Sequence, residues 1–199
     1  MRDLGAALAA QQIWVESFGL AGHRLDLHDA VAEGIDLRCI TTLRGHDLTD
    51  VDLSGLDLRG IDLSGSVLAG ASFEDANVAG SVLRGADLVR ASFVNARMVG
   101  SQVQGASLLE TRAWDANFTC AVLDGASLQG AQLHRTLLID ASLRGVIFGA
   151  TALDRCDLTG ADLTGARGTL ARPRTPPHWS WGGDLVEHLR RSGADVTYA

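Results

Sequence analysis

Residues 51–65 read VDLSG, LDLRG and IDLSG, a five-residue unit repeated three times with almost no change. Its second position is Asp, its third is Leu and its fifth is Gly in every copy. The same step continues in both directions. From Leu43 to Leu163 there are 25 positions spaced five residues apart with no insertion, and all of them except Ala113 hold a large apolar residue. These positions are referred to below as the centres.

A period of five matches neither the 3.6-residue period of an α-helix nor the two-residue period of a β-strand. It fits a short extended piece followed by a turn. The centre and the small residue two positions before it share one side of an extended chain, so this side faces a core. The residue two positions after the centre is Gly in 14 of 25 steps, and Gly favours turns. The sequence therefore predicts a solenoid of successive corners.

The number of corners in each coil follows from the glycine pattern. When the steps are grouped by four, one row of post-centre residues is Gly throughout: Gly45, Gly65, Gly85, Gly105, Gly125, Gly145 and Gly165. This favours a square coil of 20 residues. About six such coils, each rising by ~4.8 Å, would make a rod ~30 Å long.

These units, together with Ala86-Asp87-Leu88 and Ala161-Asp162-Leu163-Thr164-Gly165, resemble the pentapeptide-repeat proteins over about two thirds of the chain. The resemblance implies an all-β solenoid, a right-handed quadrilateral β-helix. Residues 8–17 are also similar to the leader of many bacterial members.

Three segments are expected. Residues 1–19 form an N-terminal helical cap, with Leu4, Leu8, Gln11, Val15 and Phe18 on one helical stripe. Residues 20–168 form the β-helix, with an imperfect first coil and a bulge near Ile40. Residues 169–199 form a C-terminal cap, in which a segment rich in Pro and Trp precedes a short helix over 184–192 and an edge strand over 194–196. We expect a homodimer through this end, with an interface formed by Trp179, Trp181, Leu185 and Leu189.

Composition excludes several kinds of chemistry. The chain has 17 Arg and no Lys, so it lacks the lysine of a P-loop or of a Schiff base. The net charge of −7 disfavours direct binding to nucleic acid. The six His and three Cys are scattered, and we identify no catalytic, cofactor-binding or metal-binding residue. The odd number of Cys and the absence of a targeting or membrane-spanning segment favour a cytoplasmic protein.

The resemblance implies two functions, both without catalysis. The quinolone-resistance members of the family are acidic rods that occupy the DNA site of DNA gyrase and topoisomerase IV, and so protect them from topoisomerase poisons. The alternative is a structural scaffold with an unknown partner. In the first case, the acids expected to stand in for phosphates are those after the centres: Asp50, Glu74, Asp75, Glu110, Asp115 and Asp154.

Trp114 follows Ala113, the one small centre, and two alternatives remain open. The indole either turns inward to fill the space that Ala113 leaves, or stays outside beside Val94 as an anchor for a partner.

Overall fold

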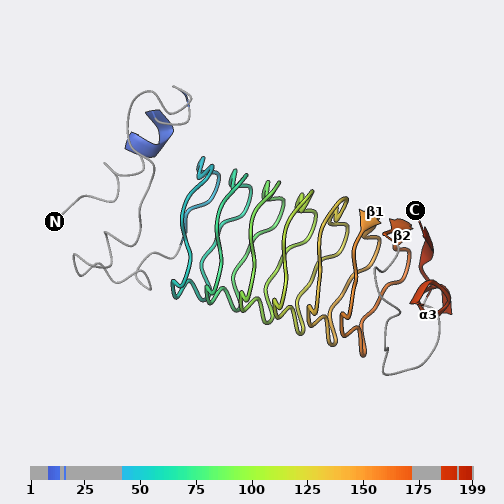
Figure 1. Ribbon diagram of the computed structural model, residues 1–199. Coiled ribbons are helices and arrows are strands. Elements are labelled where there is room, and N and C mark those ends of the chain that lie inside the picture. The colour runs from blue at the N-terminus through green and yellow to red at the C-terminus, as the bar shows by residue number, and fades with distance from the viewer. Residues whose placement is uncertain (1–8, 14–15, 17–41, 172–184, 192, 199) are drawn as a thin grey trace.

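The computed structural model describes residues 9–13, 16, 42–171, 185–191 and 193–198. Residues 42–171 form an unbroken rod of stacked coils (Figure 1). Parallel bridges join each extended residue to the one 20 positions later, from Thr42–Asp62 to Ser142–Asp162, in steps of five with no change of spacing. This confirms the 20-residue coil, and each of the four sides is a ladder of isolated parallel bridges.

The corners are hydrogen-bonded turns. In the turn after Leu83, the Ala86 N–H donates to the Leu83 carbonyl at 3.1 Å, and this bond recurs along the rod. The residue two positions after the centre has a φ of +52° to +73° in all 25 steps. A positive φ at the third residue is the feature of a type II turn, which explains why Gly is frequent there.

Each side of the rod is a face named after its row of centres. Face A has the centres Leu43, Leu63, Leu83, Val103, Leu123, Leu143 and Leu163. Face B has Leu48, Leu68, Leu88, Leu108, Leu128 and Phe148. Face C has Leu53, Phe73, Phe93, Ala113, Leu133 and Leu153, and face D has Leu58, Val78, Met98, Phe118, Leu138 and Leu158. The positive-φ residues after each row form the AB, BC, CD and DA corners, named by the faces that they join.

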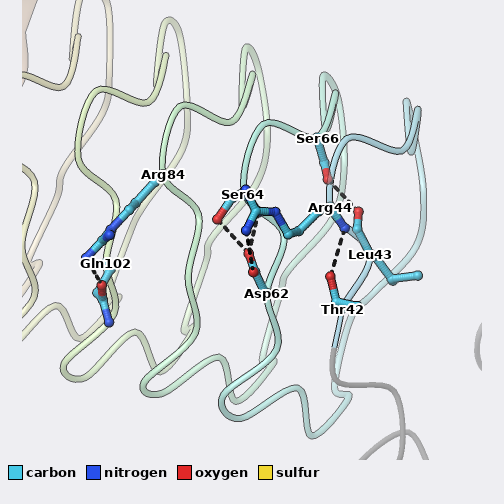
Figure 2. Close-up of polar contacts among 8 residues, drawn as sticks. All are labelled: Thr42, Leu43, Arg44, Asp62, Ser64, Ser66, Arg84 and Gln102. Atoms are coloured by element: carbon cyan, nitrogen blue, oxygen red, sulfur yellow. Dashed lines mark hydrogen bonds and ion pairs between the residues drawn. The ribbon is translucent and has the colours of Figure 1, made fainter.

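The core runs along the rod axis. The centres are buried, and so are the described residues two before them, with the exception of His46, which is exposed, and Ala161, which is partly buried. The Phe73 and Phe93 rings stack with centroids 4.9 Å apart, and Phe118 meets Phe93 edge-on at 6.2 Å. Some inward polar residues bond to the preceding coil: the Ser66 hydroxyl donates to the Leu43 carbonyl at 2.7 Å (Figure 2). Such bonds remove the cost of burying a hydroxyl between stacked coils.

The first described coil is contacted by the N-terminal segment. Residues 9–13 are helical, which confirms that part of the expected cap. Gln11 is fully buried, and its Nε2 donates to the Thr49 carbonyl at 2.8 Å. The expected first coil and the bulge near Ile40 lie outside the described residues.

The last coil ends in three short parallel strands and a helix (Figure 1). Strand β2 (Arg167–Leu170) pairs with β1 (Ile147–Thr151) on one side and with β3 (Asp195–Tyr198) on the other. Helix α3 (Leu185–Arg191) is followed by Gly193, whose φ of +85° and bond to the Arg190 carbonyl mark the helix end. The predicted terminal helix and edge strand are therefore confirmed, whereas Trp179 and Trp181 lie outside the described residues.

Leu189 of α3 is fully buried within its own chain, as is Val196 of β3. The prediction that the Leu189 side chain is available to a second protomer is therefore wrong, because this side chain already covers the last coil. In the described part of the chain, no helix has the length and apolar character needed to cross a membrane.

Candidate partner-binding surface

The seven partner-binding residues predicted from the sequence gather on face C and on the two corners that border it. Glu74, Trp114 and Asp154 each follow a centre of face C. The other four occupy its borders, Asp50 and Glu110 on the BC corner and Asp75 and Asp115 on the CD corner. Residues spread over about 100 positions of sequence thus share one side of the rod.

Four of the six acids lie within ion-pair distance of a basic side chain, three of them beside an arginine and Asp154 beside His134. Their pairs are Glu110–Arg90 at 2.9 Å, Asp115–Arg135 at 2.6 Å, Asp154–His134 at 2.9 Å and Glu74–Arg112 at 3.5 Å. Every pair bridges two coils, and the Arg135 hydrogen bond lowers the pKa of Asp115. Exposed pairs of this kind stabilise by only ~0–1 kcal/mol. Their larger effect is to reduce the negative field that the acids present to a partner.

Asp50 and Asp75 have no ion-pair partner among the described residues. Asp75 accepts a hydrogen bond from the Asn95 amide at 3.1 Å. The Asp50 carboxylate covers Gly70, its counterpart one coil later, so closely that no Cβ would fit there. Both acids lie in the first two described coils, which are therefore the most negative part of this surface.

Trp114 lies outside. Its side chain is 42% exposed, whereas that of Ala113 is 2% exposed. The inward alternative for Trp114 is therefore wrong. The indole stands on face C between Val94 and His134 of the adjacent coils.

Several other acids of the rod bond to the backbone. Asp47, Asp52, Asp57 and Asp62 each accept a hydrogen bond from the backbone N–H two residues later. Asp side chains commonly stabilise turns in this way. Figure 2 shows Asp62 held by Ser64 and by Arg44. The Ser64 hydroxyl is the main cause that lowers the pKa of Asp62, and the equivalent Thr164 lowers the pKa of Asp162 to about 2.

The structure offers no other candidate centre in the part it describes. No group of three or more His, Cys, Asp or Glu residues there could hold a metal ion. Cys120 is exposed on the DA corner, while Cys156 is buried and donates to the Leu133 carbonyl. Burial raises the pKa of the Cys156 thiol to about 12, so this residue is a packing residue.

Sequence reasoning missed the uneven distribution of side chains at the corners. The AB corner is Gly at all seven of its positions, and the DA corner departs from Gly only at Cys120 and Asp140. The other nine non-Gly residues with positive φ border face C: Asp50, Asp75, Arg90, Asn95, Glu110, Asp115, Arg135, Ala150 and Arg155. The sequence already contained this signal, because Gly is rare two positions after the centres of faces B and C.

Comparison with known structures supports the fold. QnrB1, a plasmid-mediated fluoroquinolone resistance protein, superposes with a TM-score of 0.64 at 19% identity, over 82% of this chain and 86% of that chain. HetL from Nostoc sp. strain PCC 7120, involved in heterocyst differentiation regulation, is 30% identical over 68% of this chain and 67% of its own, with a TM-score of 0.36. Rfr23 from Cyanothece 51142 is 18% identical over 72% of this chain and 95% of its own, with a TM-score of 0.48. No curated protein matches the chain.

The family model for pentapeptide repeats matches eight copies, over residues 47–85, 71–108, 116–151 and 138–167. Together these spans cover more than half of the chain. The family fold is the right-handed quadrilateral β-helix, in agreement with the 20-residue coil and the four corners described above. The chain belongs to the pentapeptide-repeat family.

Proposed function

We propose that this protein is a non-enzymatic binding protein that occupies the DNA site of a type II topoisomerase, DNA gyrase or topoisomerase IV, and protects it from topoisomerase poisons. The observation that carries the proposal is the unbroken rod with six acids on one side. No loop interrupts the coils between Thr42 and Leu170, so this side can lie lengthwise in a groove. QnrB1 gives a precedent for fluoroquinolone resistance on this fold.

The charge of the rod limits its mimicry of duplex DNA to part of its length. From Leu43 to Gly165 the rod has 15 acids and nine Arg, a net charge of −6. Duplex DNA of ~30 Å carries ~18 charges, at one per ~1.7 Å. The rod is therefore about a third as charged as DNA, and the ion pairs on face C weaken its field further. Attraction to a basic groove depends on the acids that remain unpaired, above all Asp50 and Asp75.

The test is the activity of purified DNA gyrase. Micromolar protein should inhibit supercoiling and reduce the cleavage complexes that a quinolone stabilises, and added salt should weaken both effects. Reversal of Asp75 and Asp115 to Arg should abolish them while the circular dichroism spectrum stays unchanged. The matched control reverses Asp140 and Asp157, on the DA corner and face D, and should retain both effects. Unchanged supercoiling and cleavage with the wild-type protein would contradict the proposal.

A second candidate is a scaffold whose partner is bound mainly through apolar contact. It is favoured by the exposed Trp114 and by the pairing of three of the six acids with arginines. Binding of such a partner would depend little on salt, in contrast to binding in a basic groove. The salt dependence of binding therefore separates the two candidates.

A homodimer joined at the C-terminal end, and a cytoplasmic location, remain part of the proposal. Support for the dimer comes from β3, which is the outer strand of the terminal sheet in the described part of the chain. An outer strand presents unpaired backbone groups that a second copy can pair with. Light scattering should give twice the mass of the chain, and a monomeric mass would contradict this arrangement.

A further inference from the structure

Residues other than Gly at the positive-φ corner positions carry a conformational cost, and they are frequent at only two of the four corners. For a residue with a Cβ, a left-handed backbone costs about 1–2 kcal/mol, and Gly avoids this cost. Five of six positions on the CD corner and four of six on the BC corner nevertheless lack Gly, against two of six on the DA corner and none of seven on the AB corner. The coil itself has the same geometry at every corner, so its folding does not explain the difference. The side chains bordering face C serve a purpose other than folding.

The centre of face C bears the exposed indole. Trp114 lies in the fourth of the six described coils, with Val94 beside it one coil earlier. Asp115 and Arg135, joined by two hydrogen bonds, border it on the CD corner. An aromatic side chain surrounded by polar groups that already satisfy one another has the organisation of a binding hot spot, whose rim excludes water and whose centre supplies the affinity.

The charge along this surface changes sign. The first two described coils contribute only acids, which are Asp50, Asp52, Glu74 and Asp75. All the arginines of face C and its corners belong to the next four coils. These arginines are Arg90, Arg112, Arg135 and Arg155. There they balance Glu110, Asp115 and Asp154. A surface with one acidic end and one balanced end does not match the uniform charge of duplex DNA.

We infer that the partner binds face C through two separate contacts: a basic patch opposite Asp50 and Asp75, and an apolar pocket that receives Trp114. The two contacts are two to three coils, or ~10–14 Å, apart along the rod. Only the first two coils then imitate phosphates, and the indole anchors the complex in a way that DNA cannot. The inference rests on the proposed function in so far as the partner is a topoisomerase, whose DNA groove supplies the basic patch.

The two contacts predict different responses to mutation. Trp114→Ala should weaken the affinity about thirtyfold or more, since truncation of a hot-spot Trp costs ~2 kcal/mol or more. The loss should be the same at low and high salt, because the contact is apolar. Asp75→Asn should weaken the affinity at low salt and reduce its salt dependence. Each substitution has a matched control on another side of the rod.

The experiment measures the affinity of the full chain for immobilised DNA gyrase holoenzyme by biolayer interferometry at two salt concentrations. Leu137→Ala is the control for Trp114, because Leu137 is a comparably exposed apolar residue of face D. Asp140→Asn is the control for Asp75, because both Asp residues occupy positive-φ corners. The affinities of both controls should stay within about twofold of the wild-type affinity, which is much less than the loss expected for Trp114→Ala.

If wild type binds and Trp114→Ala has no more effect than Leu137→Ala, the two-contact inference is wrong and the proposed function stands. If wild type does not bind gyrase, both the inference and the proposed function are wrong. Melting temperatures within a few degrees of wild type show that a loss of binding is not a loss of folding.

Discussion

Ala113 and Trp114 are consecutive residues on opposite sides of the coil wall, one 2% exposed and the other 42% exposed. Phe93 and Phe118 are buried in the core with their rings edge-on, whereas the Trp114 indole forms part of the surface of face C. Removal of Trp114 should therefore affect partner binding without affecting the fold.

The first prediction compares a buried ring with the exposed indole. Phe93→Ala should lower the free energy of unfolding by about 3–5 kcal/mol, because stacked coils cannot close the cavity. Trp114→Ala should change it by less than ~0.5 kcal/mol, as is usual for surface substitutions. Urea denaturation followed by circular dichroism measures both. A loss above ~2 kcal/mol for Trp114→Ala would show that the indole supports the core.

The second prediction concerns buried hydroxyls. Ser66 donates to the preceding coil, but the Ser81 and Ser101 hydroxyls are buried without a partner in the structure. Ser81→Ala should therefore raise the free energy of unfolding by about 1 kcal/mol, and the control Ser66→Ala should lower it by about the same amount. Equal losses for both variants would mean that the Ser81 hydroxyl is satisfied after all.

The third prediction concerns the C-terminal strands. Gly168 of β2 has a φ of +118° and lies against the Phe148 carbonyl oxygen of β1, where a Cβ would collide with backbone. Gly168→Ala should cost about 3 kcal/mol or more, because strain and collision add. Gly165→Ala, at a corner with a φ of +72° and more room, should cost about 1–2 kcal/mol. Thermal melting of both variants tests this order, and equal costs would contradict the close contact.

The fourth prediction concerns acid. Thr164 lowers the pKa of Asp162 to about 2 from the ordinary 3.8, and the pKa values of Asp62 and Asp115 are also lowered. A lowered folded-state pKa contributes stability above the unfolded-state pKa, and this stability is lost as the pH falls through the folded-state value. The urea midpoint should therefore drop between pH 4 and pH 2. Thr164→Val should show a smaller drop, and an unchanged drop would separate Thr164 from this effect.

Much of the architecture could be predicted from the sequence because a coil repeats one local rule. The row from Gly45 to Gly165 indicated four corners per coil, and the bridges confirm it. The pattern also placed the predicted acids directly after their centres, but their arrangement around a single face became visible only in the structure. The pattern could not show that Arg135 lies against Asp115 or Arg112 near Glu74, because such pairs depend on long side chains that reach across coils. Nor could it decide the direction of Trp114, which depends on the packing of the core around Ala113.

The central claim is that the rod occupies the DNA site of a type II topoisomerase, and displacement of DNA tests it most directly. A fluorescently labelled duplex is bound to purified DNA gyrase, and its anisotropy is followed as the unlabelled protein is added. If the rod occupies the DNA site, the anisotropy should fall to the value of free duplex. A higher concentration of duplex should then raise the concentration of protein needed for half of this fall. Anisotropy that stays at the bound value up to micromolar protein would contradict the account.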